Sequence, residues 1–525
     1  MPETQYQART LPQVVADAAL AYGAQLAITD GDVRLTYEEL NAARIQSARA
    51  FVAAGLEKGE RVAIWAPNIY QWIIAAIGAQ SVGGVLVPLN TRYKGSEAAY
   101  ILRASGAKML FTVAEFLGAR YPEMLADQDL PKLQRTVTLT EEVPQCQSWQ
   151  AFLALGEAVP VAEVERRAAA LTPEDTLDIL FTSGTTGNPK GVVTCHGQNI
   201  RTFETWSATV GLRSDDNYLI INPFFHSFGY KAGWLASIIR GAHILPVLNF
   251  DLDTVLAQIA RDRISMIPGP PTIYQSLLAH PRRDEYDLSS LRLAVTGAAP
   301  VPVELVRQMR EVLGFEVVVT AYGLTESCGV VSICRADDSA ERISHTSGCA
   351  MAGTEIQCVD KEGHVVAPGV DGEIWVRGFN TMQHYFNNPE ATSEALNSDG
   401  WLKTGDVGVM DKDGYVRITG RIKEMFIVGG FNCYPAEIEN ILCDMSGVAR
   451  AAVIGVPDER MGEVARAFLV RDAGAETDEA AVIEWARTHM ANYKVPRSVI
   501  FLDELPMNAG GKVDKAELSK WSPQR

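Results

Sequence analysis

The chain has 525 residues, of which 47% are hydrophobic and 21% are charged, and its formal net charge at pH 7 is −17. This length suffices for two or three domains with sizeable cores, and the composition is typical of a globular protein. A strongly acidic chain is poorly suited to a phosphate backbone, so we expect no nucleic-acid partner.

The eight cysteines are scattered, with no C-x-x-C spacing and no zinc-type pattern with the eight histidines. The first residues lack the basic start and apolar run of a signal peptide. The most hydrophobic stretch, residues 72–89, contains Gln80, three glycines and Pro88, which predicts a helix, a Gly-Gly turn and a strand, not a membrane span. We expect a cytoplasmic protein with reduced cysteines and no integral membrane segment.

Strand-like apolar runs alternate with helix-period segments along most of the chain. Strands are predicted at residues 61–65, 85–87, 108–112, 242–247 and 291–296, and helices at residues 37–54 and 303–313. Such alternation indicates βα units and therefore an α/β fold with parallel-type sheets that are covered on both faces.

The pattern changes twice toward the C-terminus. Residues 355–376 consist of short strands separated by turn sequences, which predicts an antiparallel β subdomain. Beyond residue 420, strands are predicted at 451–456 and 467–470, and helices at 436–445 and 478–490. We therefore expect a large N-terminal domain over residues 1–420 and a small α+β domain over residues 421–525.

Residues 182–191 form a loop rich in glycine and hydroxyl side chains that follows the apolar run 177–181. The residues of this loop that can contact an anion are Thr182, Ser183, Gly184, Thr185, Thr186, Gly187 and Lys190. Backbone N–H groups and hydroxyls can surround a phosphate, and a lysine adds positive charge. The loop lacks the Gly-Lys-Ser/Thr end of a Walker A sequence, but it still predicts a nucleotide triphosphate site.

A series of motifs from Thr36 to Lys512, this loop included, resembles in order those of the adenylate-forming superfamily. That superfamily comprises acyl-CoA synthetases, firefly luciferase and the adenylation domains of peptide synthetases. The resemblance covers nearly the whole chain. It implies a ligase that uses ATP, Mg²⁺ and CoA: a carboxylic acid and ATP give acyl-AMP and pyrophosphate, and CoA then displaces AMP.

The resemblance gives roles to three segments of the large domain. In residues 223–229, His226 would lie near the adenylate and the carboxylate. In residues 296–300, Gly297, Ala298 and Ala299 are small enough for an adenine ring to lie against the backbone. The third segment, residues 320–326, is the most diagnostic.

Within residues 320–326, Ala321 and Gly323 flank Tyr322, which would stack on adenine. Thr325 would donate a hydrogen bond to the α-phosphate. Glu326 would hold Mg²⁺, because a carboxylate beside a triphosphate needs a bridging cation to avoid repulsion.

The remaining motifs concern the ribose and the small domain. Asp406 would accept hydrogen bonds from both ribose hydroxyls, and Arg421 would reach the same sugar across a hairpin. The family rotates its small domain between the two reaction steps, and the pivot matches Lys423. In the first orientation Lys512 would neutralise charge on the reacting carboxylate and α-phosphate.

In the second orientation, Gly429 and Gly430 would line a tunnel for the pantetheine chain of CoA. The expected partners are therefore CoA and a carboxylic acid, and a homodimer is one option for the assembly.

The acyl pocket is expected to be lined by Tyr230, Lys231, Trp234, Gly297, Gly323, Cys328, Gly329 and Val330. Tyr230 and Trp234 share one face of a helix at i and i+4, and Lys231 lies about 100° from Tyr230. Lys231 either extends to the surface or faces the pocket, where it would favour a polar group on the acid. Its surroundings resemble synthetases that act on bicyclic oxo acids left over from steroid rings.

Several alternatives arise from the sequence, among them a luciferase-type oxygenase, for which no distinguishing residue is present. A medium-chain fatty acid is the second candidate substrate. An adenylation module that loads a separate carrier protein would have the same motifs. A non-catalytic nucleotide-binding regulator is disfavoured because both Glu326 and Lys512 are present.

Overall fold

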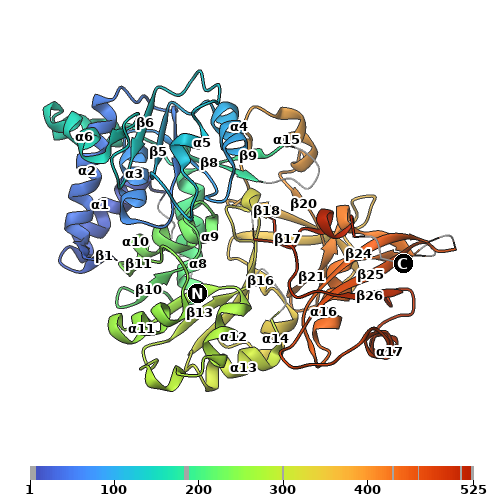
Figure 1. Cartoon of the computed structure of the whole chain (residues 1–525). Coiled ribbons are helices and arrows are strands. Elements are labelled where there is room, and N and C mark those ends of the chain that lie inside the picture. Colours follow the sequence, from blue (N-terminus) through green and yellow to red (C-terminus); the bar gives the residue numbers. More distant parts are fainter. Residues whose placement is uncertain are drawn as a thin grey trace.

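Two large sheets with helices on their faces make up most of the protein, as the computed structural model shows (Figure 1). The structure describes residues 8–182, 188–297, 301–428, 431–458, 460–508 and 511–521. No helix in these described segments is both long and apolar enough to cross a membrane.

The first sheet has nine strands, in the order β16-β15-β14-β13-β12-β10-β11-β1-β2. They are β1 (Leu26–Asp30), β2 (Val33–Thr36), β10 (Asn217–Ile220), β11 (His243–Pro246), β12 (Met266–Gly269), β13 (Leu293–Thr296), β14 (Val317–Tyr322), β15 (Ser332–Ile333) and β16 (Cys349–Ala350). The strands from β11 to β14 are paired in parallel, and the two ends of the sheet are antiparallel.

The second sheet has eight strands, in the order β19-β9-β8-β4-β3-β5-β6-β7. They are β3 (Arg61–Trp65), β4 (Val85–Pro88), β5 (Met109–Thr112), β6 (Arg135–Thr138), β7 (Gln147–Ser148), β8 (Thr176–Thr182), β9 (Lys190–Cys195) and β19 (His384–Tyr385). Its centre is parallel, so both large sheets confirm the α/β expectation.

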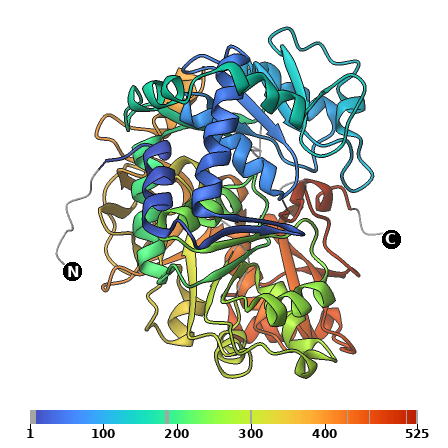
Figure 2. The same ribbon diagram turned by 90° about the vertical axis from the view of Figure 1, so that its left-hand side faces the viewer.

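Helices connect and cover these strands (Figure 2). The large domain contains α1 (Leu11–Tyr22), α2 (Tyr37–Ala53), α3 (Tyr70–Ser81), α4 (Gly95–Ser105), α5 (Tyr121–Met124), α6 (Trp149–Ala154), η1 (Leu155–Ala158), α7 (Val161–Ala169), α8 (His196–Val210), α9 (Ser227–Gly229), η2 (Tyr230–Leu235), α10 (Ala236–Arg240), α11 (Leu252–Asp262), α12 (Pro271–Ala279), η3 (Arg283–Glu285), α13 (Val303–Glu311), η4 (Thr325–Ser327), α14 (Ala340–His345) and α15 (Pro389–Ala395). α3 contacts β1 of one sheet and β3 and β4 of the other, and one hydrophobic core runs through both sheets.

The apolar stretch 72–89 illustrates how sequence becomes structure here. α3 is buried on almost all sides, and a turn with Gly83 at φ +90° leads from it into the buried strand β4. Glycine suits such a left-handed backbone conformation because it has no Cβ atom. The predicted helix, turn and strand are confirmed.

A four-stranded antiparallel sheet follows, in the order β17-β18-β20-β21. Its strands are β17 (Thr354–Val359), β18 (Asp371–Gly378), β20 (Leu402–Met410) and β21 (Val416–Arg421). This confirms the predicted β subdomain, which lies between the two large sheets and the C-terminal part of the chain (Figure 1).

The C-terminal part has its own five-stranded sheet and its own cores. Its elements are η5 (Ile422–Glu424), β22 (Phe426–Val428), β23 (Phe431–Cys433), α16 (Pro435–Cys443), β24 (Val448–Asp458), β25 (Gly462–Arg471), α17 (Glu479–His489), β26 (Ser498–Phe501) and α18 (Lys515–Leu518). The predicted strands and helices of this region are present. The boundary at 420/421 and the pivot at Lys423 stay predictions.

Candidate active site

Two segments that are predicted to contact the nucleotide leave the same edge of the nine-stranded sheet. β13 and β14 run parallel, with Thr296 opposite Thr320. Gly297 and Ala321 therefore follow these two positions on neighbouring strands. Among the residues that the structure describes, a Cβ atom built on Gly297 would meet only the Ala321 carbonyl oxygen, at 3.6 Å.

The turn after β14 depends on glycine. A Cβ atom built on Gly323 would lie 2.2 Å from the carbonyl oxygen of Gly329, closer than any side chain tolerates. Gly329 itself has φ +100° and packs against Ser227, the residue after His226. This close packing holds Thr325, which begins η4, near the His226 segment.

Tyr322, Asp406 and Arg421 form one hydrogen-bonded group. Asp406 and Arg421 are partners across the β20–β21 hairpin, and Arg421 Nε lies 2.8 Å from Asp406 Oδ1. The Tyr322 hydroxyl donates to Asp406 Oδ2 at 2.5 Å. Burial, and then the Asp406 charge, hold the pKa of Tyr322 well above its ordinary value. The candidates for contacts with adenine and ribose thus lie together.

Glu326 lies beside the end of the predicted phosphate loop. The Tyr385 hydroxyl donates to Glu326 Oε1 at 2.8 Å, and Lys190 Nζ lies 5.1 Å from the centre of the Tyr385 ring. The pairing of β19 with β9 places Tyr385 opposite Val192, two residues after Lys190. A lysine and a carboxylate separated by one aromatic ring can accompany a phosphate and its cation.

The phosphate loop itself is described only at its two ends. Thr182 and Lys190 are partners in the β8–β9 hairpin, and the Thr182 hydroxyl donates to the Lys190 carbonyl oxygen at 3.4 Å. The predicted site residues that lie outside the described residues are Ser183, Gly184, Thr185, Thr186, Gly187, Ala298, Ala299, Gly429 and Gly430.

His226 precedes the short helix α9 and caps it. Its Nδ1 accepts a hydrogen bond from the Phe228 backbone N–H at 3.2 Å, which fixes the ring orientation. The ring keeps contact with solvent, but the surrounding protein and then the positive charge of Lys512 lower the pKa of His226. A neutral imidazole is therefore expected at pH 7.

Lys512 enters the same site from the small domain. Although the residue keeps an exposed surface, partial desolvation lowers the pKa of its ammonium group, and so does the charge of Arg421. Asp406, Glu424 and Glu326 oppose this shift. These charges place Lys512 within electrostatic reach of Asp406 and Glu326, and its role in adenylation stays a prediction.

On the side expected to hold the acid, Tyr230 and Trp234 stack with ring centres 4.7 Å apart. Both are fully buried, and they pack with Trp72 from α3. The segment forms the π-helix η2 where the sequence predicted α-helical geometry. A π-turn still brings i and i+4 to one face, and such turns are frequent at functional sites.

Lys231 is fully buried, so its alternative placement at the surface is wrong. Its Nζ lies 3.2 Å from Asp178 Oδ1 on β8 and 3.1 Å from Thr194 Oγ1 on β9. The Thr194 hydroxyl also donates to Asp178 Oδ1 at 2.6 Å. The partner that a buried ammonium group requires is therefore supplied by the protein itself.

The Cys328 thiol lies near the Lys231–Asp178 ion pair. Cys328 is buried with φ +55°, and burial raises the pKa of its thiol to about 12 although Lys231 opposes that shift. The thiol is thus protonated and acts as a small apolar group beside Gly329.

Sequence reasoning missed Asp178, Gln80 and Tyr385. The amide of Gln80 donates to the Tyr230 hydroxyl at 2.9 Å, and Asp178 and Tyr385 hold Lys231 and Glu326. Each of these residues lies dozens of positions from its partner and belongs to none of the motifs. The one signal in the sequence is Asp178, because an acidic residue within the apolar run 177–181 must find a buried partner.

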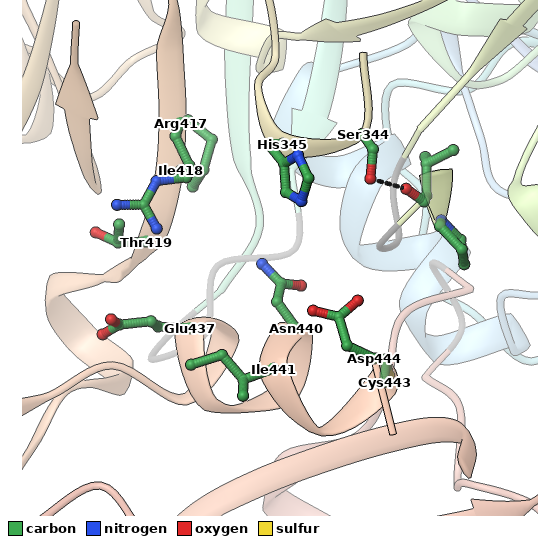
Figure 3. A pocket seen from close by; sticks show the side chains of 12 residues that line it. Ser344, His345, Arg417, Ile418, Thr419, Glu437, Asn440, Ile441, Cys443 and Asp444 are labelled. Atoms are coloured by element: carbon green, nitrogen blue, oxygen red, sulfur yellow. Dashed lines mark hydrogen bonds between the residues drawn. The ribbon is translucent and has the colours of Figure 1, made fainter. Parts of the chain in front are cut away.

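A pocket between the domains lies apart from these residues (Figure 3). Its lining comes from α14, β21, the segment before α13, and α16. His345 points toward Asn440 and Asp444 on the facing helix, and Ser344 donates to the Val301 carbonyl oxygen. None of the predicted site residues lines it, so this pocket marks where the small domain packs on the large one.

Comparison with known proteins gives two family matches. The AMP-binding enzyme family matches residues 15–386, and the AMP-binding enzyme C-terminal domain matches residues 437–512.

Two relatives are similar over nearly their whole length. The 3-[(3aS,4S,7aS)-7a-methyl-1,5-dioxo-octahydro-1H-inden-4-yl]propanoyl:CoA ligase of Rhodococcus jostii (strain RHA1) is 46% identical over 515 residues, which cover 97% of this chain and 98% of that protein. The ligase of the same name from Mycobacterium tuberculosis (strain H37Rv) is 48% identical over 510 residues, with the same coverage.

Among solved structures, the anthranilate CoA ligase AuaEII in complex with anthranoyl-AMP superposes with a TM-score of 0.87 at 27% identity. The match covers 99% of this chain and 98% of that one. The amide bond synthetase McbA from Marinactinospora thermotolerans has a TM-score of 0.86 at 28% identity, over 97% and 99% of the two chains.

Proposed function

The chain belongs to the AMP-binding enzyme family, and we propose that it is an ATP-dependent acyl-CoA synthetase. The observation that carries this proposal is the hydrogen-bonded group of Tyr322, Asp406 and Arg421, which brings together the candidate contacts for adenine and ribose. A nucleotide held there suits the adenylation of a carboxylate.

In the first step, a carboxylate oxygen of the acid attacks the α-phosphorus of ATP, and pyrophosphate leaves. In our assignment Asp406 accepts hydrogen bonds from the ribose, and Tyr322 stacks on adenine. Lys512 neutralises the charge that gathers between the carboxylate and the α-phosphate, and Thr325 donates to that phosphate. His226, held neutral, orients the acid without adding charge.

Glu326 is the residue assigned to Mg²⁺. Its carboxylate supplies hard oxygen ligands, and the hydrogen bond from Tyr385 fixes its orientation, so the residues present fit this ion. When bound, Mg²⁺ would neutralise phosphate charge. Lys190 would hold the leaving pyrophosphate from the other side of the Tyr385 ring.

In the second step the sulfur of CoA attacks the acyl carbon, the bond from that carbon to the phosphate oxygen breaks, and AMP leaves. This step requires Lys512 to withdraw, so we propose that the small domain rotates about Lys423. Gly429 and Gly430 would then line the pantetheine channel.

The acid that we propose is the bicyclic dioxo-propanoate named for the ligases of Rhodococcus jostii and Mycobacterium tuberculosis. Identities of 46% and 48% over 97% of the chain support this choice. Tyr230, Trp234 and Trp72 are fully buried against one another, so the choice of this acid is supported by the relatives and not by an open pocket beside these rings.

A substrate panel tests this function. The purified protein is incubated with ATP, Mg²⁺ and CoA plus the dioxo acid, octanoate, a long-chain fatty acid or anthranilate, and AMP, pyrophosphate and thioester are quantified. We expect the highest kcat/KM for the dioxo acid and AMP, not ADP, as the nucleotide product. Preference for octanoate would select the fatty-acid alternative, and adenylation without CoA transfer would select a carrier protein or an amine as the acceptor.

A further inference from the structure

Tyr385 lies between two opposite charges at the edge of the eight-stranded sheet. Its hydroxyl donates to Glu326 Oε1 at 2.8 Å, and Lys190 Nζ lies 5.1 Å from the centre of its ring. Glu326 is the residue assigned to Mg²⁺, and Lys190 is the residue assigned to the leaving pyrophosphate. One aromatic side chain therefore contacts a carboxylate with its polar end and an ammonium group with its face.

Lys190 and Glu326 do not pair with each other. Among the residues that the structure describes, neither side chain takes part in an ion pair. An ammonium group within about 6 Å of a ring centre is attracted to the electron-rich face, and a carboxylate that accepts a hydroxyl proton is stabilised as well. Because both interactions are weaker than a direct ion pair, both charges stay available to a nucleotide and its cation.

The backbone around Tyr385 is tied to the segments that carry both charges. The Phe386 N–H donates to the Gly191 carbonyl oxygen at 2.7 Å, which holds β19 against β9 at the residue after Lys190. On the other side, the Met382 N–H donates to the carbonyl oxygen of Glu326 at 2.7 Å. The short strand β19 thus joins the end of the phosphate loop to η4.

The Tyr385 ring is also fixed by packing. The residue is 8% exposed and belongs to a small core cluster with Val192, Met382, Ala391 and Leu402. The ring cannot turn aside without opening this cluster. It therefore separates the ammonium group from the carboxylate before any ligand binds.

We propose that Tyr385 is a positioning residue that keeps Lys190 and Glu326 apart, so that one can meet the phosphates of ATP and the other the cation. This inference rests on the roles proposed for Lys190 and Glu326. Without the ring, the two charges would attract each other directly, and ATP would have to break this pair in order to bind. Without the hydroxyl alone, the ring would still separate them, but Glu326 would lose the donor that orients it.

The test measures ATP binding by isothermal titration calorimetry in the absence of any acid, first with EDTA and then with Mg²⁺. The full-length variants are Tyr385→Phe, Tyr385→Leu, Glu326→Gln and the double variant Tyr385→Leu/Glu326→Gln. The matched control is Tyr415→Phe, because Tyr415 is 5% exposed and its hydroxyl donates to a carboxylate oxygen of Asp338 at 2.7 Å.

The measurements with EDTA test the separation of charges without any metal. We expect Tyr385→Leu to raise the Kd for ATP about fivefold or more, because Lys190 then pairs with Glu326. In the Glu326→Gln background no carboxylate remains to capture Lys190, so the same change at Tyr385 should alter the Kd by less than about twofold. An equal rise in both backgrounds would show that the ring acts by packing alone and would overturn the proposal.

The measurements with Mg²⁺ test the hydroxyl. We expect Tyr385→Phe to bind ATP in EDTA within about twofold of the wild type but to bind Mg·ATP about tenfold more weakly, since a metal ligand loses the group that orients it. A Tyr385→Phe protein that behaves like Tyr415→Phe in both conditions would also overturn the proposal. A wild-type protein that binds ATP but releases no pyrophosphate with any acid would instead contradict the proposed synthetase.

Discussion

Arg421 and Asp406 face each other across the β20–β21 hairpin, with Arg421 Nε 2.8 Å from Asp406 Oδ1. The Tyr322 hydroxyl donates a hydrogen bond to the other carboxylate oxygen, Asp406 Oδ2, and the Asp406 residue is 2% exposed. The carboxylate is therefore fixed in one orientation before any ligand arrives. Such preorganisation reduces the conformational entropy lost when ligand hydroxyls bind.

Asp406→Asn tests the ribose role. The amide keeps the shape but loses the charge, and a hydrogen bond to a charged group contributes about 1.5–3 kcal/mol, so KM for ATP should rise by roughly 10- to 100-fold. Pyrophosphate release at varied ATP measures this. Asp413→Asn, in the exposed turn of the same hairpin, is the matched control. An unchanged KM for ATP would remove Asp406 from the nucleotide site.

Substitutions of Lys512 and Lys423 should affect different steps of the reaction. Lys512→Ala removes a charge placed for the transition state and should slow adenylation by about 10²- to 10³-fold, while thioester formation from supplied acyl-AMP stays nearly intact. Lys423→Pro should do the reverse, because a fixed φ at the pivot hinders rotation. Lys423→Ala is the control for loss of the side chain. Equal damage to both steps in both variants would argue against a rotating domain.

The sequence predicted the architecture well because each element carried its own local signal. The apolar run predicted α3 and β4, and turn sequences predicted the β17–β18 hairpin. Tyr322 and Asp406, taken from two separate motifs, share a hydrogen bond, while the catalytic role of Lys512 stays a prediction. Partners that depend on tertiary packing carried no local signal. Asp178 on β8 meets Lys231 on η2, and Tyr385 on β19 meets Glu326 on η4, only because the fold packs these helical turns against the eight-stranded sheet.

Lys231→Met is expected to destabilise the protein, because it leaves Asp178 as an unpaired buried carboxylate. Breaking a buried ion pair from one side costs about 3–5 kcal/mol, and removing both charges costs less. Lys231→Met/Asp178→Asn should therefore be more stable than Lys231→Met. Thermal midpoints of the two variants measure this. If the double variant is the less stable one, the Lys231–Asp178 contact is not the source of the loss.

The double variant Lys231→Met/Asp178→Asn also tests whether Lys231 donates a hydrogen bond to the acid substrate. If its remaining N–H group donates to an oxo group of the substrate, KM for the dioxo acid should rise about tenfold, the loss of one charge-assisted hydrogen bond, while KM for octanoate stays constant. An unchanged preference between the two acids would limit Lys231 to a structural role.

His196 gives a pH dependence of stability. It is 1% exposed, its Nδ1 accepts from the Leu11 N–H at 3.0 Å, and burial lowers its pKa from 6.5 to about 4. Between these values the unfolded chain binds a proton that the folded protein does not, so stability falls as pH decreases, by about 2 kcal/mol at pH 5.

His196→Asn keeps an acceptor for Leu11 but cannot be protonated. Thermal midpoints at pH 7 and pH 5 should therefore differ less in this variant than in the wild type. His364→Asn, at an exposed position, should keep the wild-type difference. If His196→Asn retains the full pH dependence, the buried imidazole does not cause it.

The most direct measurement follows one oxygen atom. If acyl-AMP is the intermediate, the oxygen that joins the acyl carbon to phosphorus comes from the acid and stays with AMP when CoA attacks the carbonyl carbon. With the dioxo acid labelled with ¹⁸O in both carboxylate oxygens, mass spectrometry should find one ¹⁸O in each AMP for every thioester formed. AMP without label, or label in inorganic phosphate beside ADP, would contradict an adenylate-forming synthetase.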